Sequence, residues 1–313
     1  MLKFIGQRLL AGAVILLGIT TVAFLLLYLG GGDIPRKILG EGATDESVAA
    51  KAAELGLDRP LYEQFSTWLS HAVTGDLGRS WFSGQEVTDG IQSRLAVTLS
   101  LVFGAVIVIA IVSVVLGVLA ATRRGWIDRV VQVISLIGFA IPGFLIALAL
   151  VLIFAIRLGL FQPTGYVPFL TSPLGWVATV TLPIIALSLG GIASVTQQIR
   201  GAVIDALRND YVRTLRSRGL SERRIIMKHV LRNAAGPALA VLAVYFVGLL
   251  GGAVIVEQVF AIPGLGQVAV QATTQGDIPM VMGLVVATGI IVIFFNLLVD
   301  LLQGWLNPKV RLS

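Results

Sequence analysis

The sequence predicts an all-α protein that crosses a membrane six times, and three observations support this. The chain has 313 residues, of which 56% are hydrophobic and 13% charged, and its mean hydropathy is +0.91. Soluble domains carry about 25% charged residues. The charges here are also clustered, which leaves long apolar runs between them. Such runs are expected to be helices, because lipid offers no hydrogen-bond partner to the backbone and a helix satisfies its own polar groups. The charge-free windows are 9–29, 95–122, 130–156, 158–199, 233–256 and 278–299.

Five of these windows fit one span each, since about 20 helical residues cross a hydrocarbon core of about 30 Å. Window 158–199 is too long for one span, and three prolines fall in its first half. We expect a re-entering loop there, followed by one span at roughly 176–198. Window 9–29 is too long for the apolar part of a signal peptide and ends without a small-residue cleavage site, so we interpret it as a retained span.

The distribution of Lys and Arg predicts the orientation of these spans. Sixteen of them fall in the two termini, the second-to-third connection and the fourth-to-fifth connection. The other side has Arg157 and six in 30–94, and long loops are largely exempt from the charge rule. We therefore expect both termini in the cytoplasm. The predicted organisation is a cytoplasmic N-terminus and first span at 1–29, an extracytoplasmic helical cap at 30–94 and a five-helix transmembrane core at 95–313.

The predicted cap contains two short helices. Thr44 or Asp45 can cap a helix that ends near Gly56, and Pro60 fits the start of the next one. The second helix has an apolar and aromatic stripe, which either packs on span ends or the lipid surface, or docks an external partner. The stripe consists of Leu61, Phe65, Trp68, Leu69 and Ala72.

Several kinds of chemistry are disfavoured. The chain has no Gly-Lys dipeptide, so we expect no P-loop for ATP phosphates. It has no cysteine, and its two histidines, His71 and His229, lie outside the apolar windows. Neither histidine is placed to activate a serine inside the membrane, and potential metal ligands do not cluster. We therefore predict that this chain is not an enzyme.

Ionisable residues inside spans would indicate an ion or proton relay. Glu257 and Asp300 are the candidates, and we interpret both as solvated helix ends near an interface. The lack of charge at mid-membrane argues against an ion-coupled secondary carrier. Pro142 and Pro183 fall inside predicted spans and remove helix hydrogen bonds. They indicate either pathway walls that rearrange or static kinks.

The segment 200–232 has nine basic and three acidic residues. Residues Ile199, Val203, Leu207 and Tyr211 recur at helical spacing, Gly219 interrupts the pattern, and a second short helix can start after a Ser cap at position 221. We predict helix, turn and helix with the basic side chains outward. Such a loop could bind anionic lipid heads, nucleic acid or a protein partner, and its place between two spans disfavours nucleic acid.

The residues in this loop resemble a known cytoplasmic signature, that of ABC importer permeases of the dipeptide and oligopeptide family, first-partner type. Segments 55–80 and 256–267, and Asp277 with Pro279, resemble the same family, whereas 30–35 departs from its Pro-Gly-Asp-Pro. Leu215 also departs, because the family usually has Ala there. The matching residues in the loop are Tyr211, Arg213, Thr214, Gly219, Leu220, His229, Leu231, Arg232 and Asn233.

The resemblance implies a six-span permease of the type I ABC importer kind in the cell inner membrane. It implies as partners a second homologous permease, two ABC ATPases that bind ATP and Mg, an extracytoplasmic solute-binding protein and the lipid bilayer. A coupling helix around 213–220 would sit on one ATPase. The implied ATPase-coupling residues are Tyr211, Arg213, Thr214, Leu215, Arg216, Arg218, Gly219, Leu220 and His229.

The resemblance implies a di- or oligopeptide as the transported solute, on family frequency. Relatives also serve nickel chelates, glutathione and sugars, so these remain alternatives. An ion-coupled carrier and a membrane scaffold are the alternatives from other classes. No substrate-binding residue can be named, because the apolar windows contain no charge.

Overall fold

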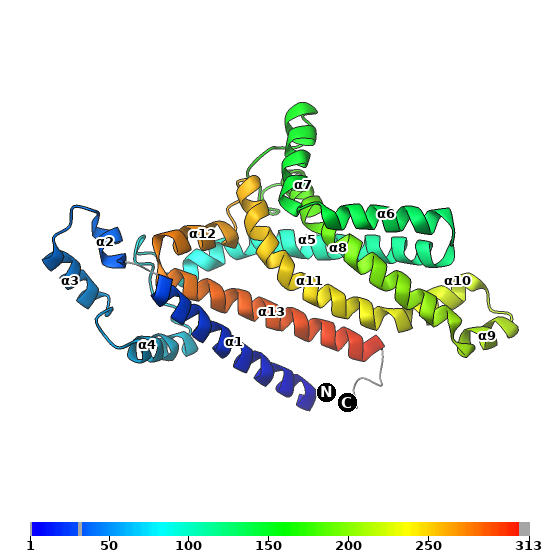
Figure 1. Ribbon diagram of the computed structural model, residues 1–313, viewed down its shortest axis with the longest axis horizontal. Helices are drawn as coiled ribbons and strands as arrows, with labels where there is room; N and C mark the ends of the chain where they lie inside the picture. The colour runs from blue at the N-terminus through cyan, green and yellow to red at the C-terminus, as the bar shows by residue number, and fades with distance from the viewer. Residues whose placement is uncertain (1, 31–32, 307–313) are drawn as a thin grey trace. The chain divides into compact units, whose positions relative to one another are not determined.

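The protein is α-helical throughout the part that the computed structural model describes, residues 2–30 and 33–306 (Figure 1). Helix accounts for 81% of the structure, and the described residues hold no β structure beyond an isolated bridge between Arg79 and Glu86. The predicted all-α class is confirmed. The first helices are α1 (Leu2–Gly30), α2 (Ile34–Leu39), α3 (Asp45–Glu54), α4 (Leu61–Val73), α5 (Val87–Thr122), α6 (Trp126–Ala140) and α7 (Gly143–Leu150). They are followed by α8 (Pro173–Arg208), α9 (Asp210–Ser217), α10 (Glu222–Ile225), α11 (Leu231–Val259), α12 (Leu265–Gln275) and α13 (Ile278–Leu306).

Five helices of the described chain are long and apolar enough to cross a membrane. They are α1, α5, α8, α11 with the turns that lead into it, and α13. Four of the predicted windows, 9–29, 95–122, 233–256 and 278–299, fall in α1, α5, α11 and α13. A bent pair of helices, Trp126–Ala140 and Gly143–Arg157, passes the same test together and brings the number of spans to as many as six.

The third predicted span, 130–156, is formed by this bent pair of helices, and the interruption lies at Pro142, which the sequence indicated as a residue that removes helix hydrogen bonds. Its two halves meet at an angle of 96°. Ile141 has extended backbone angles, φ −86° and ψ 122°, and Pro142 follows it. A proline disfavours helical geometry in the residue before it and supplies no N–H to the preceding turn, which accounts for the break. Pro183, in contrast, lies inside the unbroken helix α8.

Helix α8 is longer than predicted at both ends. Residues 158–172 form turns and irregular backbone, and Ser172 then caps the helix, its Oγ accepting a hydrogen bond of 3.1 Å from the N–H of Gly175. The helix continues to Arg208, well past the predicted end at 198. The first part of the segment 200–232 is therefore a continuation of a span and not a separate amphipathic helix.

The structure consists of two compact units. The first is centred on Val97–Ile262, where α8 packs against α6, α7 and α11. Aromatic rings add to this packing, since Phe246 and Phe295 stack with their centroids 3.6 Å apart. Small residues allow the helices to approach closely. A Cβ at Gly191 would lie 2.4 Å from the side chain of Ile109.

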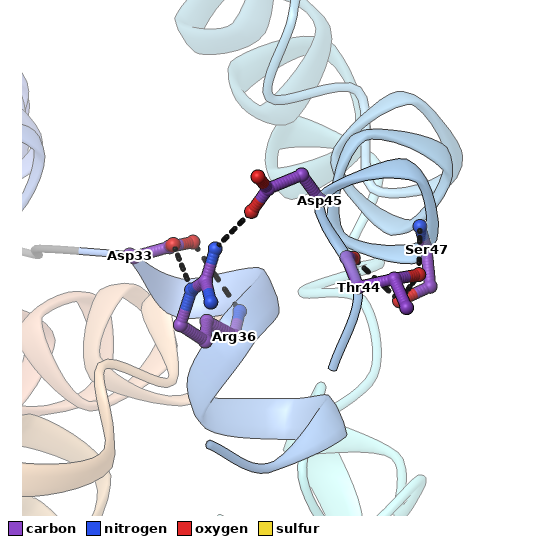
Figure 2. Close-up of polar contacts among 5 residues, drawn as sticks. All are labelled: Asp33, Arg36, Thr44, Asp45 and Ser47. Atoms are coloured by element: carbon purple, nitrogen blue, oxygen red, sulfur yellow. Dashed lines mark hydrogen bonds and ion pairs between the residues drawn. The ribbon is translucent and has the colours of Figure 1, made fainter. Parts of the chain in front are cut away.

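The second unit combines Gln7–Ala96 with Pro263–Ile293 and contains the predicted cap. Thr44 caps α3 as predicted, because its Oγ1 accepts a hydrogen bond from the N–H of Ser47 at 3.3 Å (Figure 2). Arg36 joins α2 to the start of α3 by donating to Asp33 at 3.0 Å and to Asp45 at 2.7 Å. The hydrogen bond to Asp45, and to a smaller extent that to Asp33, raises the pKa of the Arg36 guanidinium above its ordinary value.

The aromatic stripe of α4 packs within this second unit. Pro60 immediately precedes the helix, and the side chains of Phe65 and Trp68 are half-buried. The ring of Phe65 lies 5.1 Å from that of Phe24 in α1 and 5.9 Å from that of Trp68, centroid to centroid. Only Leu61 at the start of the stripe stays 43% exposed. These contacts fit the interpretation in which the stripe packs on the end of a span.

Glu257 is not the solvated helix end that we expected. Its side chain is 0% exposed, and its Oε1 accepts a hydrogen bond of 2.6 Å from Thr98 Oγ1 in α5. The prediction failed because α11 continues to Val259, so Glu257 lies inside the helix and faces a neighbouring span. A second buried carboxylate, Asp277, accepts hydrogen bonds from Ser80 Oγ and from the N–H of Trp81 within the other unit.

Candidate functional site: the loop between α8 and α11

A short helix, α9, follows α8 after a single break at Asn209. Asn209 has an extended conformation, φ −70° and ψ 147°, and its side-chain amide donates to the carbonyl of Asp205 at 3.3 Å. Asn readily makes such local bonds to the backbone, so it ends the long helix here. Asp210 then begins α9, where a carboxylate complements the positive end of the helix dipole.

Helix α9 has one buried side chain and a polar outer surface. Val212 is 0% exposed and anchors the helix, while Tyr211 and Leu215 are half-buried. The exposed positions carry the polar and basic side chains, which are therefore available to a partner. They are Asp210, Arg213, Thr214, Arg216 and Ser217, with Arg218 just after the helix.

The turn after α9 explains why a glycine stands at position 219. Gly219 has φ +76°, in the left-handed region that favours glycine. Its N–H donates to the carbonyl of Arg216 at 2.9 Å, and the N–H of Leu220 donates to that of Leu215 at 3.2 Å. This pair of bonds is the Schellman motif, which often places apolar residues where Leu215 and Leu220 stand. The predicted left-handed geometry at Gly219 is confirmed.

An ion pair closes the turn. Arg216 donates to the two carboxylate oxygens of Glu222 at 2.5 and 3.2 Å, joining α9 to α10. The hydrogen bond that the Arg216 guanidinium donates to Glu222 raises the pKa of this guanidinium. Ser221 precedes α10 as predicted, but its side chain makes no capping bond. Among the described residues, Arg218, Arg223 and Arg224 pair with no carboxylate, so the loop presents cations outward.

The structure brings the two halves of the loop signature together. The side-chain amide of Asn233, at the start of α11, donates to Tyr211 Oη of α9 at 3.0 Å. Arg232 Nε donates to the carbonyl of Leu306 at the end of α13, at 2.9 Å. His229 lies in a π-helical turn, Ile226–Val230, and is half-buried. Residues from the second half therefore contact α9 through Tyr211 and α13 through Leu306, while Arg213 and Thr214 of α9 are exposed.

Sequence reasoning missed two contributors to this site. The first is Val212, the buried residue of α9. It does not follow the four-residue spacing of apolar residues from Ile199 to Tyr211, because the break at Asn209 shifts the helical register. An Asn in a helical pattern was the available signal. The other is the ion pair between Arg200 of α8 and Asp128 of α6, at 2.5 and 2.7 Å, whose side chains are only 23% and 15% exposed. Nothing in the sequence pairs these residues.

Comparison with known proteins gives matches along the whole chain. Residues 113–312 match the family described as binding-protein-dependent transport system inner membrane component, and residues 1–102 match its N-terminal family. A Brucella abortus (strain 2308) protein, named as a peptide transport system permease, is 38% identical over 312 residues, covering 99% of both chains. The glutathione transport system permease protein GsiC of Escherichia coli O6:H1 is 34% identical over 312 residues, again covering 99% of both.

A solved structure shares the fold. A chain of the MetNI methionine ABC transporter in an inward-facing conformation matches with a TM-score of 0.55 and 18% identity, over 67% of this chain and 93% of that chain. The likeness supports the predicted permease fold, and the sequence matches extend over both termini and the loop. The chain therefore belongs to the family of inner membrane components of binding-protein-dependent transport systems, whose members are the non-catalytic permease subunits of ABC transporters.

Proposed function

We propose that this chain is the permease subunit of an ABC importer that moves di- or oligopeptides from an external binding protein into the cytoplasm. The observation that carries the proposal is the helix α9, which has one buried valine, exposes arginines and ends in a turn closed by two backbone hydrogen bonds. The near full-length similarity to a protein named as a peptide permease supports the choice of solute.

Helix α9 acts as the coupling helix in this proposal. A cytoplasmic ATPase receives its exposed face, while ATP and Mg stay in the ATPase. Closure of two ATPases moves α9, and the motion passes to α8 through the single residue between them and to α11 through the hydrogen bond between Asn233 and Tyr211. A second permease completes the pathway, which opens alternately to each side.

Glutathione is a second candidate solute, because GsiC of Escherichia coli is named as a glutathione permease and matches 99% of this chain. Glutathione is itself a tripeptide, so both candidates are peptides. Transport of labelled dipeptide, oligopeptide and glutathione by membranes that contain the complete importer separates them. Nickel-chelate or sugar uptake in place of all three would overturn the peptide assignment.

The test of coupling is copurification from native membranes in mild detergent. We expect a second six-span permease and two P-loop ATPases with the wild-type chain, and loss of the ATPases with Gly219→Asp, whose side chain strains the turn at φ +76°. The matched control is Gly84→Asp, at φ +70° in the predicted cap, with equally open surroundings. Equal ATPase recovery from both variants would sink the coupling role of α9.

The predicted orientation has its own test. A single cysteine near Gly42, introduced into this cysteine-free chain, should react with a membrane-impermeant maleimide in intact cells, whereas one at Ser217 should react only after permeabilisation. Gly42 and Ser217 are both exposed, so protection cannot come from burial within this chain. Labelling in the opposite order would reverse the topology and place the cap, 30–94, in the cytoplasm.

A further inference from the structure

The first unit contains a cavity of about 590 Å³ that the proposed function does not use. Helices α5, α8, α11 and α13 line it. Its walls are aliphatic, formed by side chains such as Val114, Ile199, Ala238 and Leu242. Water gains few hydrogen bonds in such a space, and apolar cavities of this kind bind apolar molecules readily. The walls therefore suit a hydrocarbon chain.

One end of the cavity is positively charged. Lys228 and Arg232, about one helical turn apart, contribute the charged side chains among its lining residues. Within the described chain, neither of these side chains pairs with a carboxylate. Arg232 Nε donates a hydrogen bond to the carbonyl of Leu306 at 2.9 Å, and its other N–H groups remain available. Trp305, 69% exposed, lies beside them in the lining. Trp is enriched where a membrane span meets the interface, and so are basic side chains that face anionic headgroups.

From this combination we infer that the cavity binds an anionic phospholipid, with an acyl chain along the aliphatic walls and the phosphate between Lys228 and Arg232. A free phosphate would leave the walls unfilled. A peptide would place its own polar backbone against aliphatic side chains that offer it no hydrogen bond. A basic pocket between membrane helices is a chemically suitable site for an anionic headgroup. The inference does not depend on which solute is transported.

The test measures lipid retained by the purified full-length chain, by native mass spectrometry, after incubation with equal amounts of phosphatidylglycerol and phosphatidylethanolamine. We expect phosphatidylglycerol to be preferred at least fivefold. Lys228→Gln should lower its retention about fivefold, as expected for one basic group at a membrane surface. Arg224→Gln is the matched control, because Arg224 is an exposed cation one turn earlier and outside the cavity lining.

A second variant tests the walls independently of charge. Ala238→Phe places a ring in the cavity and should lower retention of both lipids severalfold. Lys228→Gln changes an exposed side chain, so the loss of lipid that it causes is not explained by misfolding. Equal losses with Lys228→Gln and Arg224→Gln would overturn the proposal, since the attraction would then belong to the whole basic loop. Displacement of the lipid by millimolar inorganic phosphate would also overturn it. So would unchanged lipid retention in Ala238→Phe, because the lipid would then lie outside the cavity.

Discussion

Close packing at Gly283 makes a sharp prediction about the second unit. Gly283 of α13 faces α5, and a Cβ added there would lie 2.2 Å from Val87 Cγ1 and 3.3 Å from the side chain of Ile91. Val87 is 0% exposed, so it cannot swing into open space. Small residues permit such close helix contacts in membranes. Gly283→Ala should therefore force the two helices apart.

The expected magnitude follows from two opposing effects. Overpacking by one methyl group costs about 1–3 kcal/mol, whereas replacing a helical glycine by alanine gains up to about 1 kcal/mol from helix propensity. We expect Gly283→Ala to be destabilised by about 1–2 kcal/mol. The measurement is thermal unfolding in detergent, followed by tryptophan fluorescence, with the same preparation used for every variant.

A double variant and a matched glycine decide whether the clash is the cause. Val87→Ala removes the atom that the new Cβ meets. In the double variant Val87→Ala/Gly283→Ala the clash is therefore absent. We expect the double variant to be about 2 kcal/mol more stable than the sum of the two single effects predicts. Gly251 of α11 has no atom within 4 Å of an added Cβ. Gly251→Ala should therefore be neutral or stabilising. Gly283→Ala as stable as Gly251→Ala would refute the reasoning.

Three further substitutions test individual contacts. Thr98→Val should cost about 2 kcal/mol in the same unfolding assay because the Glu257 carboxyl group loses a buried donor, and Thr98→Ser should recover most of it. Asp128→Asn should cost about 1–3 kcal/mol by leaving the Arg200 guanidinium unpaired, and a loss of under 0.5 kcal/mol would show that the pair is not formed. Thr44→Ala should raise amide hydrogen exchange in the first turn of α3 about fivefold, a loss of about 1 kcal/mol of capping, while Thr44→Ser stays near wild type.

The sequence was most informative where one physical rule dominates. Long charge-free windows require helices in lipid, and four of them coincide with single helices. Rules for helix caps and for glycine in turns also predicted local structure correctly. Thr44 caps α3, and Gly219 has the left-handed conformation that its place after an amphipathic pattern indicated. These features depend on residues within one turn of each other, so the sequence contains what is needed to predict them.

Features that depend on tertiary neighbours were harder to predict. The sequence indicated a disturbed helix at Pro142 within 130–156, but it did not predict that the two apolar halves meet at an angle of 96°. Glu257 looked like a solvated helix end, and only the neighbouring α5 shows that Thr98 supplies a buried donor. The hydrogen bond between Tyr211 and Asn233 joins residues 22 positions apart across a turn. Both residues match the signature, but the spacing did not predict their contact.

Within the proposed function, the contacts around α9 decide which helices an ATPase can move. The turn at Gly219 and the Arg216–Glu222 ion pair connect α9 to α10. The Tyr211–Asn233 hydrogen bond ties α9 to the start of α11, so a displacement of α9 must move the base of α11 as well. Helix α8 packs along α11 and is clamped to α6 by the Arg200–Asp128 pair. A push on α9 is therefore delivered to α8, α11 and α6 together, as one packed group of helices. Helix α7, beyond the 96° break after α6, also packs against α8 and α11, so it belongs to the same packed group and would move with it.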